Sequence, residues 1–106
     1  MPTISRGFVD QGQLKDEVAR AARALDPGEV REVRFSLGTD SSGEPAIFFA
    51  ILLTPYGSQE YRLAEVTGRV ATTLFDNIQP YNQWGLQSYF DFTSDKAQYG
   101  NTEDLL

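Results

Sequence analysis

The block at residues 30–53 constrains the fold more than any other part of the chain. Its first segment, VREVRFSL, alternates apolar and polar residues, which is typical of a strand with one solvated face. Its last segment, AIFFAILL, is apolar throughout, which predicts a strand buried on both faces. The intervening GTDSSGEP supplies the residues that a turn requires. The block therefore predicts a β-hairpin whose second strand is the more deeply buried one.

Helical periodicity flanks this hairpin on both sides. Apolar residues recur every three or four positions across residues 14–25, and the Asp-Pro-Gly sequence at 26–28 predicts the end of that helix. A second apolar stripe covers residues 63–74, with Ser58 as its expected N-cap and an end near Ile78. Two amphipathic helices are therefore expected, the first of them short.

Alternation returns at residues 86–93, which predicts a third strand with one core face. Residues 1–93 are expected to form a single domain, because 106 residues suffice for one core. Residues 94–106 are acidic and show little apolar periodicity, so we expect a loosely held tail. Gly68 lies inside the second helix, where it indicates close approach of the backbone to the sheet.

These elements predict an α+β fold in the order α-β-β-α-β. The expected sheet is mixed and three-stranded, with both helices on one face and a right-handed crossover between the second and third strands. With the first strand in the middle, the strand order becomes third, first, second. Residues 46–53 would then form a long apolar edge, which proteins usually cover. Pairing of two such edges, or burial of the open sheet face, favours a homodimer.

This element order is similar to the topology of type II KH domains and ribosome-binding factors, and it resembles half of a ferredoxin-like fold. The KH resemblance implies a GxxG loop between helices that clamps nucleotides. No two of the nine glycines stand three positions apart, so no binding residue is assigned from the resemblance.

Composition excludes several classes of chemistry. The chain contains no histidine and no cysteine, which rules out Cys/His zinc sites, disulfides and His-dependent nucleophiles. We therefore expect no catalytic residues, no metal and no cofactor. The net charge of −6 opposes nucleic-acid binding. Neither a signal-peptide run nor a membrane-length apolar stretch is present in the sequence, so a cytoplasmic protein without a membrane partner is expected.

Four arginines, Arg20, Arg23, Arg31 and Arg34, fall in one stretch of sequence. Acidic residues alternate with them, among them Glu29, which favours a solvated face of mixed charge. A basic patch built from these arginines is the alternative.

The hairpin loop is the strongest local candidate for polar chemistry. Its two carboxylates and two serines resemble a fragment of a calcium loop, but the ligand spacing of an EF-hand is absent. The same residue types form solvated turns, which is the favoured interpretation. The candidate residues are Asp40, Ser41, Ser42 and Glu44.

An aromatic-rich stretch begins at residue 81 and is more suggestive of protein binding. Its candidate partner-binding residues are Tyr81, Trp84, Tyr89 and Tyr99. Strand alternation predicts an exposed Tyr89, whereas Trp84 is expected to cap the core.

The sequence thus favours a small acidic, non-catalytic protein-binding module that forms a homodimer. Its size and charge resemble those of antitoxin, immunity or inhibitor proteins, whose negative charge steers a basic partner. The alternative is a KH-like nucleic-acid-associated or small-ligand-binding domain that uses the arginines.

Overall fold

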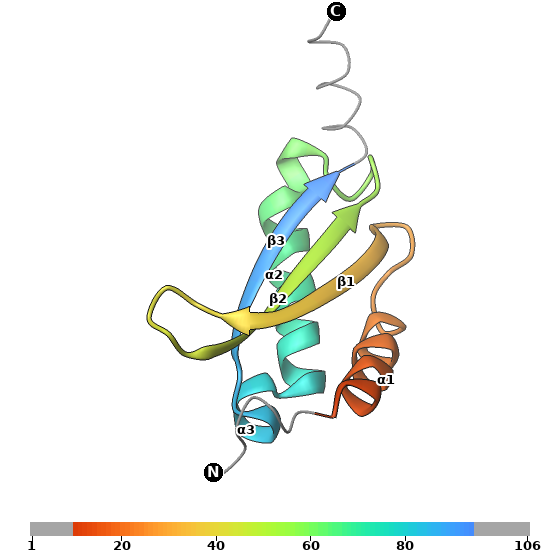
Figure 1. Cartoon of the computed structure of the whole chain (residues 1–106). Coiled ribbons are helices and arrows are strands. Elements are labelled where there is room, and N and C mark those ends of the chain that lie inside the picture. The colour runs from red at the N-terminus through yellow and green to blue at the C-terminus, as the bar shows by residue number, and fades with distance from the viewer. Residues whose placement is uncertain (1–9, 95–106) are drawn as a thin grey trace, which may run out of the picture.

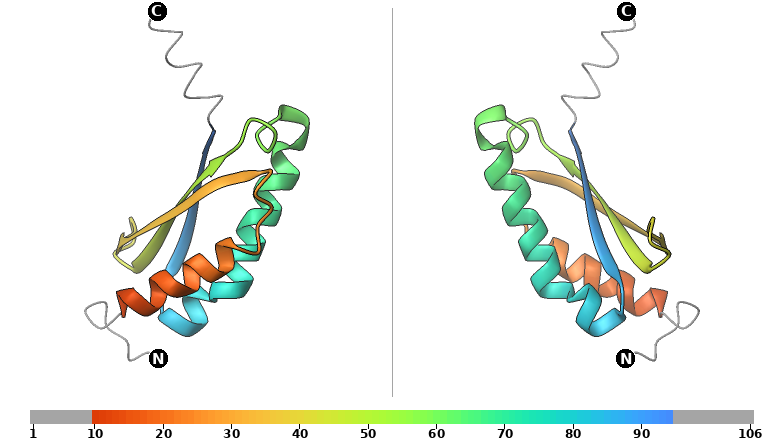
Figure 2. Two further views of the ribbon diagram at one scale, coloured as in Figure 1. Left: turned by 90° about the vertical axis from the view of Figure 1, so that its right-hand side faces the viewer. Right: turned by 90° about the vertical axis from the view of Figure 1, so that its left-hand side faces the viewer.

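Two helices pack on one face of a three-stranded sheet, as the computed structural model of residues 10–94 shows (Figure 1, Figure 2). The elements are α1 (Gln11–Ala22), β1 (Val30–Thr39), β2 (Pro45–Leu53), α2 (Glu60–Ile78), α3 (Pro80–Trp84) and β3 (Gln87–Ser94). The predicted α+β class and the succession α-β-β-α-β are confirmed, with the short helix α3 inserted before the last strand. The expected tail lies outside the described residues, apart from Ser94, which ends β3.

The strand β2 is the centre of the sheet. It pairs antiparallel with β1 and parallel with β3, so the sheet order is β1-β2-β3. The expected order of third, first, second is therefore wrong, and the apolar segment is not an edge. The central position pairs both backbone edges of the most apolar strand, which leaves the less apolar β1 and β3 at the edges.

One row of β2 side chains forms the middle of the core. Ile47, Phe49, Ile51 and Leu53 point toward the helices and are all buried. Phe49 also stacks on Phe90 of β3, with ring centroids 5.1 Å apart. The helices supply the facing residues Leu14, Val18 and Ala21 from α1 and Val66, Val70, Leu74 and Ile78 from α2. Each large side chain buried in this way contributes about 1.5–3 kcal/mol to the free energy of unfolding.

The opposite side chains of β2 have no helix over them (Figure 2). Phe48 and Leu52 are half-buried and Ala50 is exposed. The expectation that this strand is buried on both faces is therefore wrong for the single chain, because both helices occupy the same side of the sheet. We call this side the open face. It consists of Glu32, Arg34 and Ser36 from β1, Phe48, Ala50 and Leu52 from β2, and Tyr89, Asp91 and Thr93 from β3.

The start of α2 differs from the prediction, whereas its predicted end at Ile78 is confirmed. Ser58 is not its N-cap: the N-cap position is held by Gln59, and the Ser58 hydroxyl instead donates to the Pro55 carbonyl within the preceding turn. At the other end, Gln79 adopts a left-handed conformation with φ 53°, and Pro80 starts α3. Proline suits this first helical position because the backbone N–H there has no partner within the helix. Residues 80–84 therefore form a short helix directly after α2.

Close backbone approach occurs at Gly57 and not at Gly68. A Cβ at Gly68 would have no atom within 4 Å other than its own helix and neighbours, so the prediction for this residue is wrong. A Cβ at Gly57 would lie 2.8 Å from the Glu29 Cα, which no ordinary packing permits. The turn before α2 therefore fits against the start of β1 only because residue 57 lacks a side chain.

The two glycines predict opposite effects of the same substitution. Gly68→Ala should raise the free energy of unfolding by about 1 kcal/mol, because alanine is the better helix former and meets no obstacle. Gly57→Ala should lower it by about 1–3 kcal/mol through overpacking against Glu29. Urea denaturation followed by circular dichroism measures both values. A destabilising Gly68→Ala or a neutral Gly57→Ala would contradict this assignment.

Candidate functional site

The predicted hairpin loop forms a turn held by one carboxylate. Asp40 Oδ1 accepts hydrogen bonds from the backbone N–H groups of Ser42 at 2.9 Å and Glu44 at 3.0 Å. Gly43 has φ 83°, which a glycine adopts without strain. Ser41 is exposed at the tip. Within residues 10–94, no group of three or more acidic side chains is placed to hold a metal ion. Within this loop, the Asp40 carboxylate thus serves to bond the local backbone.

The second oxygen of Asp40 connects this loop to β3. The Tyr89 hydroxyl donates a hydrogen bond to Asp40 Oδ2 over 2.7 Å. This bond, followed by those from the loop backbone, lowers the pKa of Asp40, and it raises the pKa of Tyr89. The Tyr89 ring also stacks on Phe48 of β2 with centroids 5.4 Å apart. Two separately predicted candidates, the loop and one aromatic residue, are therefore brought together at one end of the open face.

The other aromatic candidates do not join them. Tyr81 is exposed on α3, which lies beyond the start of β3 (Figure 1). Trp84 is buried, and its indole N–H points to Glu17 Oε1 at 3.4 Å, so it serves the core and cannot contact a partner directly. Tyr99 lies outside the described residues. The three candidates that lie within residues 10–94 therefore do not form one surface, and among them Tyr89 belongs to the open face.

The open face has an apolar centre between two charged edges. Its centre carries Phe48, Ala50 and Leu52, and a hollow of about 160 Å³ lies over Ala50. On the β1 edge, Arg34 Nε lies 2.6 Å from Glu32 Oε2, and this hydrogen-bonded pair raises the pKa of Arg34. The β3 edge carries an exposed aspartate, Asp91, whose Cα is paired in register with that of Ala50.

Three of the four arginines, Arg20, Arg23 and Arg34, do not lie on a common surface. Arg20 and Arg23 lie at the end of α1 in the helix layer, whereas Arg34 lies on the open face of β1. The connection between α2 and α3 is the single residue Gln79, which leaves no room for a nucleotide-clamping loop like that of KH domains. These features give the nucleic-acid alternative no supporting geometry within residues 10–94.

A second hollow separates α2 from β3. It measures about 550 Å³ and is lined mainly by small and apolar side chains, including Leu63 and Phe92, with Glu60 as its one ionisable residue. Small-molecule sites place several polar groups around such a space to orient a ligand. Its other polar lining residues carry hydroxyl groups, and because no charged group of residues 10–94 besides Glu60 lines the space to anchor a ligand, we assign none. These hydroxyl-bearing residues are Ser58, Thr67, Thr93 and Ser94.

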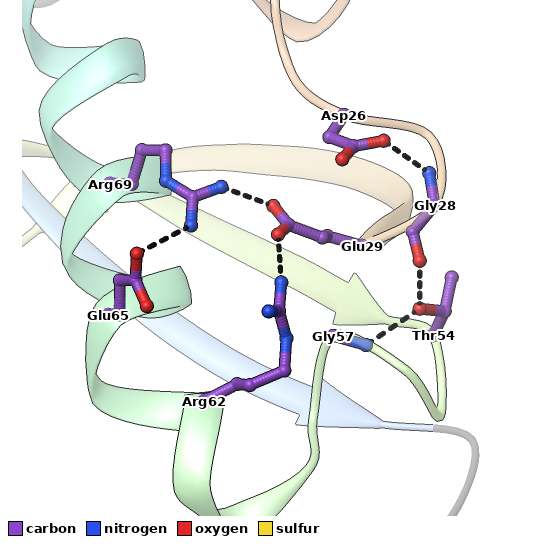
Figure 3. Close-up of polar contacts among 8 residues, drawn as sticks. All are labelled: Asp26, Gly28, Glu29, Thr54, Gly57, Arg62, Glu65 and Arg69. Atoms are coloured by element: carbon purple, nitrogen blue, oxygen red, sulfur yellow. Dashed lines mark hydrogen bonds and ion pairs between the residues drawn. The ribbon is translucent and has the colours of Figure 1, made fainter.

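A buried carboxylate cluster lies where β1 begins (Figure 3). Glu29 is 3% exposed, and its two oxygens each lie 2.6 Å from an arginine of α2, Oε2 from Arg62 and Oε1 from Arg69. Arg62 also covers the Tyr56 ring at 4.3 Å. The interpretation of Glu29 as a solvated residue is therefore wrong. No local pattern could have revealed this cluster, since its partners stand 33 and 40 positions away.

The cluster fastens the helix layer to the sheet. The Glu29 carbonyl accepts from the Thr54 N–H at 2.9 Å, so the same residue binds the end of β2 and two side chains of α2. Both carboxylate oxygens are occupied by charged donors, which leaves none to act as a base. We therefore assign the cluster a structural role and take the open face as the candidate functional site.

No protein-family model matches the chain, and none of the curated proteins or solved structures matches it either. The helices of residues 10–94 are too short or too polar to traverse a lipid bilayer. The function must therefore be inferred from the exposed chemistry of the fold.

The Glu29 cluster predicts a large difference between two identical substitutions. Glu29→Gln should lower the free energy of unfolding by about 2–3 kcal/mol, because it leaves partly buried arginines without their carboxylate. Glu65→Gln removes an exposed partner of the same Arg69, at 3.5 Å, and should cost less than about 0.5 kcal/mol. Chemical denaturation compares the two variants. Equal costs would show that burial does not strengthen the Glu29 contacts.

The Asp40–Tyr89 bond predicts a change in acid titration. Tyr89→Phe should raise the pKa of Asp40 toward its ordinary value, because the largest cause of the lowering is removed. Because the pKa of Asp40 is lower in the folded chain than in the unfolded chain, its ionised carboxylate stabilises the fold at pH values above the ordinary carboxyl pKa. This stabilisation is lost as the pH falls through the lowered pKa. NMR titration of the Asp40 carboxyl carbon measures the shift, with Tyr81→Phe as the control. An unchanged Asp40 pKa in the Tyr89→Phe variant would contradict the assignment.

Proposed function

We propose that this chain is a non-catalytic protein-binding module and that the open face is its binding surface. The observation that carries the proposal is the uncovered apolar centre of β2, where Ala50 is exposed and Phe48 and Leu52 are half-buried. Tyr89, 43% exposed, extends this centre onto β3. The absence of histidine and cysteine from the sequence supports a non-catalytic role.

The shape and chemistry of the open face favour a protein over other ligands. Its hollow of about 160 Å³ is smaller than the roughly 300 Å³ at which sites for small molecules begin. An apolar centre with a charged rim is the usual organisation of protein interfaces, where tyrosine and arginine are enriched. The net charge of −6 opposes binding of nucleic-acid phosphates.

Self-association is part of the proposal. The support for self-association is not an apolar strand edge, because β2 is the central strand. The support is the apolar centre of the open face, which the helices leave uncovered because both lie on the other side of the sheet. A cytoplasmic location remains proposed as well. Antitoxin, immunity and inhibitor proteins provide the functional model, and for a second, basic partner the negative charge would raise the rate of association.

The proposal is tested by placing a charge at the centre of the open face. Ala50→Glu should abolish capture of partner proteins, because it places a larger, charged side chain at the apolar centre on which any complex formed there must pack. Ala19→Glu is the matched control, since Ala19 is exposed on α1 in the opposite layer. Tagged wild-type, Ala50→Glu and Ala19→Glu chains are incubated with untagged chain and with a lysate of the source cells, and retained proteins are quantified by mass spectrometry.

The expected result is one set of proteins, the untagged chain included, retained by the wild type and by Ala19→Glu and reduced at least tenfold with Ala50→Glu. Equal retention by all three chains, or retention of no protein by the wild type, would overturn the proposal. Circular dichroism of each variant verifies that the fold is intact.

A further inference from the structure

The nine residues of the open face are arranged in three rows across the sheet. Strand register places Arg34, Ala50 and Asp91 in the middle row. Each row crosses β1, β2 and β3 in that order, so the row begins on one edge of the sheet and ends on the other. The flanking rows are Ser36, Phe48 and Tyr89 on one side and Glu32, Leu52 and Thr93 on the other.

The middle row has opposite charges at its two ends. Arg34 on β1 and Asp91 on β3 are both exposed, and the small side chain of Ala50 lies between them. A two-fold axis that runs along β2 and lies in the interface exchanges the two edges of the sheet while it brings the two open faces together. Under this symmetry, Arg34 of one copy lies opposite Asp91 of the other, and the pair forms twice.

The flanking rows are compatible with the same symmetry. Ser36 would lie opposite Tyr89, and Glu32 opposite Thr93, so no like charges lie directly opposite each other. Glu32 keeps its contact with Arg34 Nε, and the terminal nitrogens of Arg34 face Asp91 of the other copy. The apolar residues of β2 meet across the axis. Ala50 is the smallest of them and lies at the crossing point, where it lets the two sheets approach closely. Facing sheets pack about 10 Å apart with strands inclined by about 30°.

From this self-complementarity, and resting on the proposed function, we propose that the partner of the open face is a second copy of this chain. The two sheets pack face to face with their β2 strands parallel, and Arg34 of each copy pairs with Asp91 of the other. The alternative two-fold axis, which crosses the strands, places Arg34 against Arg34 and Asp91 against Asp91. Like charges opposed in this way are strongly unfavourable in an interface, so the charges select the parallel arrangement.

The size of the face sets the strength of the dimer. Three strands about 4.8 Å apart, with about eight residues at about 3.3 Å each, give a projected area of roughly 400 Å² per copy. A standard interface buries about 800 Å² per partner. The dimer interface is therefore small, and we expect a dissociation constant of about 1–100 µM.

Charge reversal tests this geometry directly. Arg34→Asp sets two carboxylates against each other in both pairs, and Asp91→Arg sets two guanidinium groups against each other, so each variant should raise the dissociation constant at least tenfold. In an equimolar mixture, one chain is acidic at both positions and the other is basic at both, which restores two attractive pairs. The mixture should recover the wild-type affinity as a heterodimer. Matched controls are Arg20→Asp on α1 and Asp76→Arg on α2, both exposed away from the open face.

The experiment is sedimentation equilibrium from about 1 µM to about 500 µM, a range that brackets the expected affinity. Recovery of the dimer in the mixture, with unchanged controls, supports the proposal. A wild-type dimer that survives both reversals, or a mixture that stays monomeric, would overturn it. A monomeric wild type also overturns the dimer proposal. If the wild type is monomeric but captures another protein through Ala50, the proposed protein-binding function still stands. If it is monomeric and captures no protein in this way, the dimer proposal and the proposed function both fail.

Discussion

The apolar segment that forms β2 imposes the constraint on which the rest of the structure depends. It carries large apolar side chains on both sides, and its backbone is paired on both edges once β1 and β3 flank it. One side is covered by α1 and α2, which bury Ile47, Phe49, Ile51 and Leu53. Because the two helices share that side, the row of Phe48, Ala50 and Leu52 has no covering layer within residues 10–94. The position of the proposed binding surface is therefore a consequence of how the core is built.

Polar contacts fix this sheet at both ends of the hairpin. At one end, Glu29 binds two arginines of α2 and the backbone of Thr54, so the start of β1, the end of β2 and the helix layer are held together. At the other end, Asp40 follows β1 and accepts a hydrogen bond from Tyr89, which reaches it from β3 across the stacked ring of Phe48. These contacts at the two ends of the hairpin help to keep the three strands, and with them the residues of the open face, in register. A preorganised surface of this kind loses less conformational entropy on binding.

Local patterns predicted the elements well and their relations less well. The alternation of residues 30–37, the apolar run of 46–53 and the helical stripes are properties of neighbouring residues, and the hairpin and both helices followed from them. The sheet order did not follow from the sequence, because a central strand and a covered edge strand have the same apolar pattern. Glu29 was misjudged because its partners are distant in sequence, and Gly57 rather than Gly68 marks a close approach that only the tertiary fold creates. Of the candidate site, alternation identified Tyr89, whereas Phe48 and Ala50 were hidden within a run that was expected to be buried.

The most direct test of the central claim, that the open face is the surface through which two copies of this chain bind each other, is an NMR dilution series of the isotopically labelled wild type. The claim predicts that backbone amide signals of the open-face residues, above all Ala50, Arg34 and Asp91, shift with concentration, while those of α1 and α2 stay constant. Concentration-dependent shifts confined to the helix layer, or none at any concentration up to about 1 mM, would contradict it, since a dimer weaker than this has less than about 4 kcal/mol of association free energy.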